Sequence, residues 1–437
     1  MLLLQIADIH FRYPECNTPD MDPDRVYRTR LISDAKERVR TLGSVGAILV
    51  GGDIAFRGIE AEYTAALAWL KELAEASGCP IERVFVVPGN HDVDRSVITK
   101  SLAVQNVQAA ISSAPAERRE RLLRAQFMNA ETGRTLLEPL AAYNEFAKIF
   151  SCQVFPPERL YWKQSLELDD GVTLRIHGLT STILSGIHGL DDTRESLYLS
   201  PLQTILDPVE DVVNLVMSHH PPDWFKDHDE IEDAVQGRAA IHMFGHKHRQ
   251  RIARDRRYVR LAAGAVNPDR YEPGWQPGYN LVNVQVEGYG AERKLLIDSH
   301  LLAWQTNPEM FRPMADGTAG EIFSHSVAFP SRNLSHPVSL PPVRVEAAQR
   351  TEAIELPNDS VEASMSDEHT RNLVFRFWKL TASQRRDVSL KLGLIEKSEL
   401  KLPEPERYGR ALLRAGERGL LEALANEVAE KEINHGR

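Results

Sequence analysis

Five short segments of this chain each place Asp, Asn or His side chains directly after an apolar run. The apolar runs have the length and composition of β-strands, so the polar residues fall on the loops that follow them. The segments are Asp8-Ile9-His10, Gly51-Gly52-Asp53, Gly89-Asn90-His91-Asp92, His219-His220-Pro221 and Gly245-His246-Lys247-His248. This pattern suits an α/β fold in which the strand ends carry the functional loops.

The chain around these segments alternates strand and helix patterns, which also predicts an α/β sheet. Glu60–Ser77 has apolar residues at helical spacing. Strands are predicted at Leu2–Ala7, Ala47–Val50, Val84–Val87, Val172–Gly178, Val212–Ser218, Ala239–Phe244, Tyr258–Ala263 and Tyr279–Val286. An extended tail is predicted from there to about residue 330.

Three stretches depart from this alternation. Residues 94–150 have helical patterns without a strand candidate, which predicts a helical insertion that caps the site. Residues 331–368 combine four prolines with Ser, Glu and Asp, a composition typical of a flexible linker. Residues 369–437 are strongly helical, with Ser383–Leu392 and Tyr408–Glu430 as predicted helices. We therefore expect a main domain over 1–330 and a separate small all-α domain over 369–437.

Composition limits the partners of the chain. The net charge of -10 argues against charge-driven, non-specific nucleic-acid binding by the whole molecule. No apolar stretch approaches the roughly 20 residues that span a bilayer, so no membrane partner is expected. Cys16, Cys79 and Cys152 are widely spaced, which fits a reducing compartment and predicts a cytoplasmic protein.

The five segments offer oxygen and imidazole nitrogen ligands and no thiolate. Such a set favours Mn, Fe, Zn or Ni, of which we expect Mn. Two divalent ions about 3.5–4 Å apart can clamp a phosphoryl group and generate hydroxide at neutral pH. Asp8 and His10 are two residues apart in an extended segment, so both side chains project to one side. We therefore expect a site for two divalent metal ions.

In this order, the five segments resemble the pattern of the calcineurin-like metallophosphoesterases: D-x-H, G-D, G-N-H-[DE], H and G-H-x-H. The resemblance covers roughly residues 1–300 and implies a four-layer αββα sandwich of two mixed sheets flanked by helices. It implies that one metal binds Asp8, His10, Asp53 and His248, and that the second binds Asp53, Asn90, His219 and His246. Asp53 would bridge the two ions.

The resemblance also assigns roles to neighbouring residues. It implies that His91 contacts the phosphate or protonates the leaving group, and that Asp92 orients His91 by a hydrogen bond. The family's ligand precedes a proline by two positions, which selects His219 and leaves His220 to line the site or pack below it. His177 and His242 lie within predicted strands, and we interpret them as core residues.

Four arginines bear on the substrate. Arg12 and Arg57 follow the first two segments, where each would contact a substrate phosphate or pair with a local carboxylate. Arg249 and Arg251 would share one face of a hairpin beside the metals, where they could hold phosphates. The alternative for the hairpin is ordinary solvated surface charge.

The five segments alone do not separate diester from monoester hydrolysis. The chain looks most like the cyclic-nucleotide phosphodiesterase and nuclease branches, and Phe56 stands where purple acid phosphatases carry a tyrosine ligand. We therefore predict a metal-dependent phosphodiesterase that attacks a nucleotide or nucleic-acid diester with a metal-bridging hydroxide. One alternative is a phosphomonoesterase. Another is an inactive scaffold, against which the intact ligand set argues.

Residues 369–437 resemble the small death-like, effector-associated domains of bacterial conflict systems. That resemblance implies a partner protein that recruits or activates the main domain, as in defence against phage. The alternative is a stabilising bundle or a dimerisation module. A homodimer would also fit the metallophosphoesterase resemblance.

Overall fold

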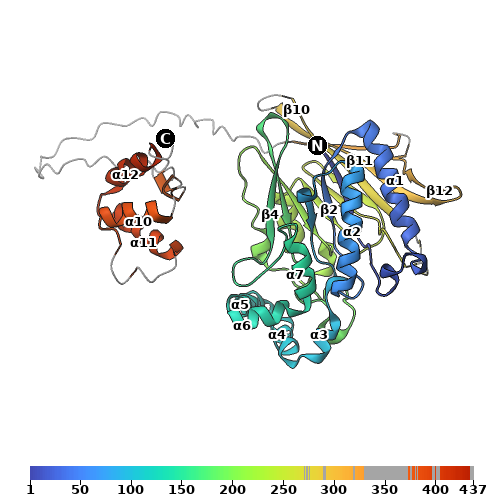
Figure 1. The fold of residues 1–437 in the computed structure, drawn as a ribbon, viewed down its shortest axis with the longest axis horizontal. Helices are drawn as coiled ribbons and strands as arrows, with labels where there is room; N and C mark the ends of the chain where they lie inside the picture. Colours follow the sequence, from blue (N-terminus) through green and yellow to red (C-terminus); the bar gives the residue numbers. More distant parts are fainter. Residues whose placement is uncertain are drawn as a thin grey trace, which may run out of the picture. The chain divides into compact units, whose positions relative to one another are not determined.

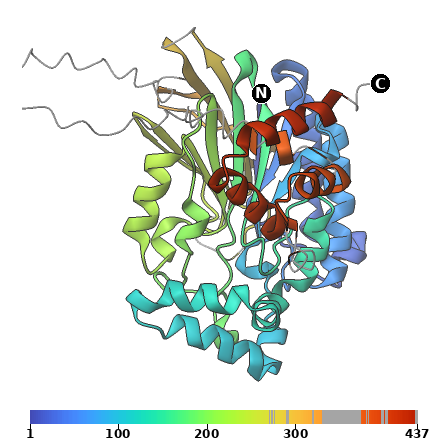
Figure 2. The same ribbon diagram turned by 90° about the vertical axis from the view of Figure 1, so that its left-hand side faces the viewer.

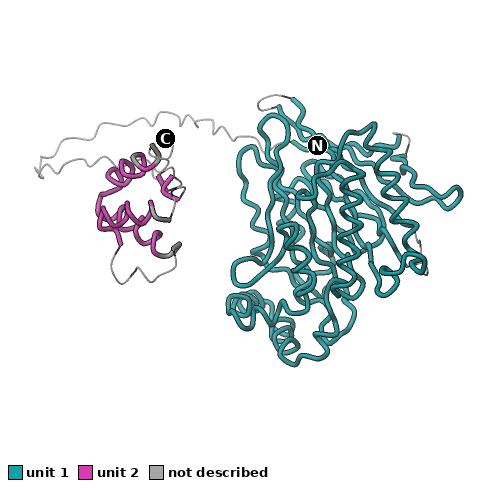
Figure 3. Tube along the Cα trace, viewed as in Figure 1, with its two compact units in different colours: residues 1–338 teal, residues 339–437 magenta. Residues whose placement is uncertain are grey.

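A computed structural model describes residues 1–328, apart from gaps at 270, 272–273, 275, 289–291 and 318–319, and much of 373–433. The chain divides into two compact units, residues 1–338 and 339–437 (Figure 3). The predicted linker, 331–368, lies outside the described residues. Each unit is therefore described by itself.

The first sheet of the larger unit is mixed. Its strands are β1 (Leu2–Ile6), β2 (Val45–Val50), β3 (Val84–Val86), β10 (Gly278–Glu287), β11 (Lys294–Thr306), β12 (Glu309–Pro313) and β13 (Phe323–Ala328). Their order is β12-β11-β10-β1-β2-β3, with β13 paired to β11. β1, β2 and β3 are parallel, whereas β10 to β13 pair in antiparallel fashion.

The second sheet is also mixed. It contains β4 (Trp162–Glu167), β5 (Thr173–Gly178), β6 (Val212–Ser218), β7 (Ile241–Phe244), β8 (Arg251–Asp255) and β9 (Tyr258–Ala262). The order is β4-β5-β6-β7-β9-β8, with four parallel central strands and an antiparallel strand at each edge.

Helices pack against both sheets. α1 (Arg25–Leu42) and α2 (Glu60–Ser77) lie side by side over the first sheet (Figure 1). α8 (His228–Arg238) contributes Ile231 and Val235 to a buried cluster with Val216 of β6. The main core joins apolar residues of both sheets with those of α1 and α2. The predicted sandwich of two mixed sheets and flanking helices is confirmed.

Helices fill the segment between β3 and β4. They are α3 (Arg95–Lys100), α4 (Leu102–Ser112), α5 (Ala116–Met128), α6 (Ala130–Leu137) and α7 (Ala141–Lys148). α4, α5 and α6 gather at one end of the unit (Figures 1 and 2). That this insertion caps the site stays a prediction.

The stretch from residue 288 to 328 differs from the extended tail predicted for it. It holds β11, β12 and β13, which complete the first sheet. β4 and β8 were also missing from the predicted strands, although β8 forms one arm of the hairpin suggested for the arginine-rich segment.

The smaller unit is helical where it is described. Its helices include α10 (Ala382–Lys391), α11 (Glu404–Glu417) and α12 (Leu421–Ile433). They share a core of their own, in which Tyr408 of α11 and Leu424 of α12 are buried together with Phe377. The single helix predicted over Tyr408–Glu430 is wrong, because two helices occupy that range. Gly419 adopts φ +65° and the Leu420 N–H donates to the Ala415 carbonyl at 2.8 Å, which ends α11.

None of the helices in the described part of the chain combines the length and the apolar character needed to cross a membrane.

Candidate metal centre

All seven predicted metal ligands lie on loops that follow strands and meet at one place. Asp8 and His10 follow β1, Asp53 follows β2, Asn90 follows β3, His219 follows β6, and His246 and His248 follow β7. The carboxyl ends of the parallel strands of both sheets therefore supply the site. Five of these side chains are buried, and those of His246 and His248 are partly exposed.

Asp8, His10 and His248 form one half of the cluster, with ligand atoms that lie within 4.8 Å of one another. Asp8 Oδ1 is 3.4 Å from His248 Nε2. On the other side, His10 Nε2 is 3.3 Å from Asp53 Oδ2. This half thus offers two imidazole nitrogens and two carboxylates, as the resemblance implied.

Asp53, Asn90, His219 and His246 form the other half. The Asp53 Oδ2 atom is also 3.3 Å from His219 Nε2, so a single oxygen faces both halves. Asn90 Oδ1 is 3.0 Å from His219 Nε2 and 3.0 Å from His246 Nδ1. The position of Asp53 is the one that a bridging carboxylate needs.

Backbone contacts favour the metal-binding form of two histidines. The Asn267 carbonyl lies 3.1 Å from His10 Nδ1, and the Gly51 carbonyl lies 2.8 Å from His219 Nδ1. Because a carbonyl only accepts hydrogen bonds, each Nδ1 carries a proton, which leaves Nε2 as the nitrogen that would bind a metal. These residues therefore fit divalent metals with nitrogen and oxygen ligands.

Five of the seven predicted ligands adopt left-handed backbone conformations, which non-glycine residues rarely do. Their φ angles are +54° for Asp8, +52° for His10, +53° for Asp53, +67° for His246 and +51° for His248. Each such residue costs of order 1–3 kcal/mol unless its surroundings hold it. The fold therefore maintains strained loops where it brings the ligands together.

The electrostatics keep the central carboxylate ionised. Burial alone would raise the pKa of Asp53, but the imidazoles of His219 and His10 outweigh burial and hold this pKa well below its ordinary value. Burial lowers the pKa of His246 to about 3, so its imidazole is neutral and can act as a ligand. Burial lowers the pKa of His219, but the negative charge of Asp53 outweighs burial and raises this pKa to about 9. Metal binding would therefore displace a proton from His219.

His91 lies beside this cluster, held by Phe56. The His91 Nδ1 atom is 3.0 Å from the Phe56 carbonyl, and the two rings stack at 4.8 Å. The His91 backbone N–H donates to Asp53 Oδ1 at 2.8 Å. Because the carbonyl fixes the proton on Nδ1, the Nε2 atom is left to face a substrate.

The predicted hydrogen bond between Asp92 and His91 is wrong. Its carboxylate accepts hydrogen bonds from the backbone of Ala55 (3.0 Å) and Gly89 (2.8 Å) and from the Tyr63 hydroxyl (2.9 Å), and not from His91. Burial, reinforced by the Asp53 charge, raises the pKa of Asp92 to about 6. Asp92 thus joins the second and third ligand loops by accepting hydrogen bonds from their backbone N–H groups.

The structure separates His219 from His220. His219 Nε2 faces Asp53 and Asn90, whereas His220 Nδ1 is bonded to the Ser181 hydroxyl at 3.0 Å. His220 is buried, its Nε2 lies 3.8 Å from Asp192 Oδ2, and its ring packs 4.5 Å from that of His246. This arrangement favours His219 as the ligand and His220 as a residue of the site wall.

The predicted arginines lie at the edge of the site. The Arg12 guanidinium lies 3.7 Å from the centre of the Phe56 ring, on which His91 also stacks. Arg57 is exposed on the same loop. Arg249 lines a hollow together with His248. Their contact with a substrate stays a prediction.

Two residues that shape the site, Glu62 and Trp224, were not among the predicted site residues. The buried Glu62 carboxylate accepts from the backbone N–H groups of Phe56 (3.1 Å) and Arg57 (2.8 Å) and so orders the loop behind His91. Trp224 packs on the His246 ring at 4.0 Å. Glu62 lies in the first turn of the predicted helix Glu60–Ser77, six residues after Phe56. A carboxylate at this position, close to the loop that follows Asp53, is the feature of the sequence that could have indicated its role.

The chain is similar to known proteins over both of its units. Residues 1–250 match the calcineurin-like phosphoesterase family, and residues 369–430 match the GTPase-associated adaptor domain. An uncharacterized metallophosphoesterase-like protein of Bacillus subtilis (strain 168), YydB, is 21% identical over 330 residues, which cover 72% of this chain and 63% of YydB. The chain thus spans less than two thirds of this relative.

Solved structures resemble the chain at lower identity. Vps29 of Chaetomium thermophilum is 11% identical, with 75% of this chain and 99% of Vps29 covered and a TM-score of 0.29. GAP50 of Plasmodium is 10% identical, with 76% and 90% covered and a TM-score of 0.39. The sulfate thiohydrolase SoxB of Thermus thermophilus is 12% identical, with 75% and 56% covered and a TM-score of 0.32.

The family match covers more than half of the chain and contains all five ligand segments. With the ligand side chains gathered around Asp53, these findings show that the chain belongs to the calcineurin-like phosphoesterase family.

Proposed function

We propose that the protein is a metal-dependent phosphodiesterase that hydrolyses a nucleotide or nucleic-acid phosphodiester. The observation that carries this proposal is the Asp53 oxygen placed 3.3 Å from both His10 and His219, with further ligands on each side. Two divalent ions bound there would activate a water molecule and stabilise negative charge on the phosphoryl oxygens. Mn²⁺ is the proposed metal, and Fe, Zn and Ni are the alternatives that suit the same nitrogen and oxygen ligands.

The chain's own residues orient the phosphoester. His91 presents Nε2 toward the reacting group, where it contacts a phosphoryl oxygen or, when protonated, donates to the leaving oxygen. Arg12 and Arg249 lie at the edge, where guanidinium groups can pair with phosphate oxygens. Diester hydrolysis is favoured over monoester hydrolysis because Phe56 replaces the tyrosine ligand of the purple acid phosphatases.

For the C-terminal unit, we propose a role in recruiting a partner protein. The match of residues 369–430 to an adaptor domain described as GTPase-associated supports this, and makes a GTPase the first candidate partner. We also propose an effector role in a bacterial conflict system, a cytoplasmic location and a homodimeric state. The three cysteines are unpaired, which supports a reducing compartment.

The test compares bis-p-nitrophenyl phosphate with p-nitrophenyl phosphate as substrates for metal-stripped protein to which Mn²⁺, Ni²⁺, Zn²⁺ or Mg²⁺ is returned. We expect no turnover without metal, restoration by Mn²⁺, and a higher kcat/KM for the diester. A higher kcat/KM for the monoester would instead identify a phosphomonoesterase.

Asp53→Asn tests the assignment of the bridging carboxylate. We expect diester hydrolysis to fall by at least about 1000-fold, because both metals lose a charged ligand at once. Circular dichroism should show an unchanged fold. Turnover that survives this substitution would disprove the metal assignment.

A further inference from the structure

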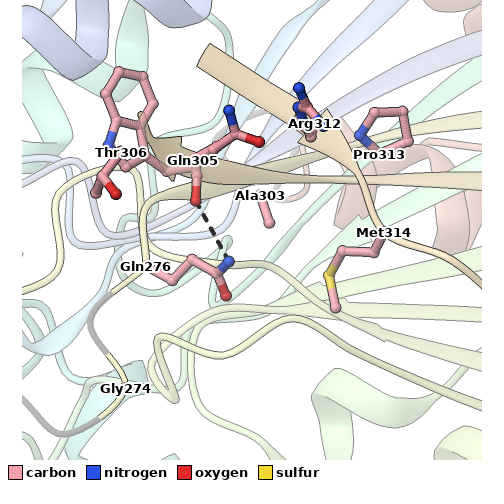
Figure 4. Close-up of a pocket in the computed structure, with 9 residues that line it drawn as sticks. Gly274, Gln276, Ala303, Gln305, Thr306, Arg312, Pro313 and Met314 are labelled. Atoms are coloured by element: carbon pink, nitrogen blue, oxygen red, sulfur yellow. Dashed lines mark hydrogen bonds between the residues drawn. The ribbon is translucent and has the colours of Figure 1, made fainter. Parts of the chain in front are cut away.

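A groove leads away from the candidate metal centre along β8, β11 and β12. It consists of two hollows of about 270 Å³ and about 550 Å³. The smaller one is lined by the metal ligand His248 together with Arg249 and Arg251. Both hollows are lined by Gly274, Gln276 and Met314, so they adjoin each other. Figure 4 shows the residues of the larger hollow.

Side-chain amides fix the floor of this groove between the two sheets. Gln250 follows His248 by two residues, and its Nε2 donates to the carbonyls of Tyr279 (2.9 Å) and Leu302 (3.1 Å) on β10 and β11. Gln276 donates to the Trp304 carbonyl at 3.5 Å, the contact drawn in Figure 4. The groove is therefore built from regular strands joined by defined contacts.

The described residues that line the groove carry a charge opposite to that of the whole protein. Arg249 and Arg251 line the end at the metal centre, and Arg312 on β12 lines the other end. Among the described residues that line the two hollows there is no Asp or Glu. On a chain with a net charge of -10, such a local excess of arginine favours a polyanionic ligand.

The remaining lining residues distinguish between polyanions. The amide nitrogens of Gln276 and Gln305 donate to backbone carbonyls, which leaves their side-chain oxygens to accept hydrogen bonds from a sugar or a base. The hydroxyl of Thr306 can bond to the same groups, and Met314 offers apolar surface to a base. Each hollow has the size of a small-molecule pocket or less, about 300–1,000 Å³ being typical. Such a space suits a few nucleotides of a single strand.

We infer that this groove binds a single-stranded nucleic acid, with the phosphate to be cut at the metal centre and the adjoining nucleotides along Arg251, Gln276 and Arg312. The inference rests on the proposed function and narrows its substrate to a chain of several nucleotides. Affinity should therefore increase with strand length and fall with salt.

Binding can be measured by fluorescence anisotropy with labelled single strands of 2 and 12 nucleotides, on the full chain carrying Asp53→Asn to prevent cleavage. We expect the 12-mer to bind at least about 10-fold more tightly than the dinucleotide, since it adds phosphate contacts. Arg251→Glu and Arg312→Glu should each weaken 12-mer binding about 5- to 10-fold and reduce the slope of log K against log salt by about 1. Arg312→Gln should have a smaller effect.

Arg257→Glu is the matched control, because Arg257 is exposed at the turn of the β8–β9 hairpin and lines neither hollow. It should change 12-mer affinity less than 2-fold. The inference is overturned if the groove variants weaken binding no more than this control does. It is also overturned if a duplex or inorganic polyphosphate binds as tightly with the same arginine dependence.

The experiments distinguish an error in the strand-binding inference from an error in the phosphodiesterase proposal. Hydrolysis of bis-p-nitrophenyl phosphate by the unmodified protein depends on the metal centre and needs no long groove. Turnover of this small diester without arginine-dependent strand binding would reject the groove alone. Absence of turnover with every metal would reject the phosphodiesterase proposal, whatever the binding result.

Discussion

Gly89 determines how closely the third ligand loop approaches the bridging carboxylate. A Cβ atom on this residue would lie 2.1 Å from Asp53 Oδ1 and 2.4 Å from Asp53 N. Both distances are far below van der Waals contact, and the obstructing atoms belong to a buried, strained loop. A side chain at position 89 would therefore have to displace Asp53 itself.

We predict that Gly89→Ala reduces metal affinity and diester hydrolysis by about 10- to 100-fold or more, as expected when a residue supporting a ligand is altered. Metal content after dialysis and bis-p-nitrophenyl phosphate turnover would measure this. Gly237→Ala on α8 is the control, because nothing lies within 4 Å of its added Cβ. It should preserve both quantities. Equal behaviour of the two variants would contradict the account of the loop.

At this scale the candidate ligands could be proposed from the sequence, because their oxygen and nitrogen atoms belong to their own side chains and their order resembles a known family pattern. Phe56 and Asn267 support His91 and His10 through backbone carbonyls, which every residue possesses, so their identities give no signal. The contacts of Asp92 were mispredicted for a related reason. Its partners are N–H groups of loops whose mutual approach only the folded chain defines.

At the scale of elements, His177 and Asn214 join β5 to β6 inside the second sheet. His177 Nε2 lies 3.0 Å from Asn214 Oδ1, and His177 is fully buried. Burial lowers the pKa of His177 to about 4, below its ordinary value of 6.5. The unfolded chain therefore binds more protons between these two pH values, so stability is present above pH 6.5 and is lost as the pH falls toward 4.

We predict that His177 alone makes the larger unit about 1–2 kcal/mol less stable at pH 5 than at pH 7. Urea unfolding in the presence of a chelator would measure this in the original protein and in His177→Gln, whose neutral amide can still donate to Asn214. The variant should lose correspondingly less stability on acidification. If both proteins show the same pH dependence, His177 does not titrate as described.

The strands that could be predicted from the sequence include those whose side chains are buried on both faces of a sheet. β1, β2 and β6 are apolar nearly throughout, so their runs are visible without knowledge of their neighbours. β4 and β8 are edge strands with largely exposed side chains, and β11 carries Asp298 and His300 within its length. Their strand conformation depends on pairing with distant strands, which a local pattern does not show.

At the scale of the whole molecule, the two units have separate cores. The core of the larger unit includes residues from Leu2 to Val327, whereas that of the smaller unit runs from Leu373 to Val428. All seven candidate ligands and the groove residues belong to the larger unit. Folding and chemistry of the larger unit should therefore not require the smaller one.

We predict that a chain ending at Pro330 hydrolyses bis-p-nitrophenyl phosphate with a kcat/KM within about 3-fold of the full chain, because its core and metal centre stay intact. Residues 369–437 alone should be helical by circular dichroism and inactive. Steady-state kinetics with equal metal occupancy would test the first expectation, and the full chain prepared in parallel is the control.

A truncated chain that is folded and metal-loaded but inactive would mean that the C-terminal unit completes the active site. Retained activity would instead assign that unit to recruitment, in keeping with its match to an adaptor domain.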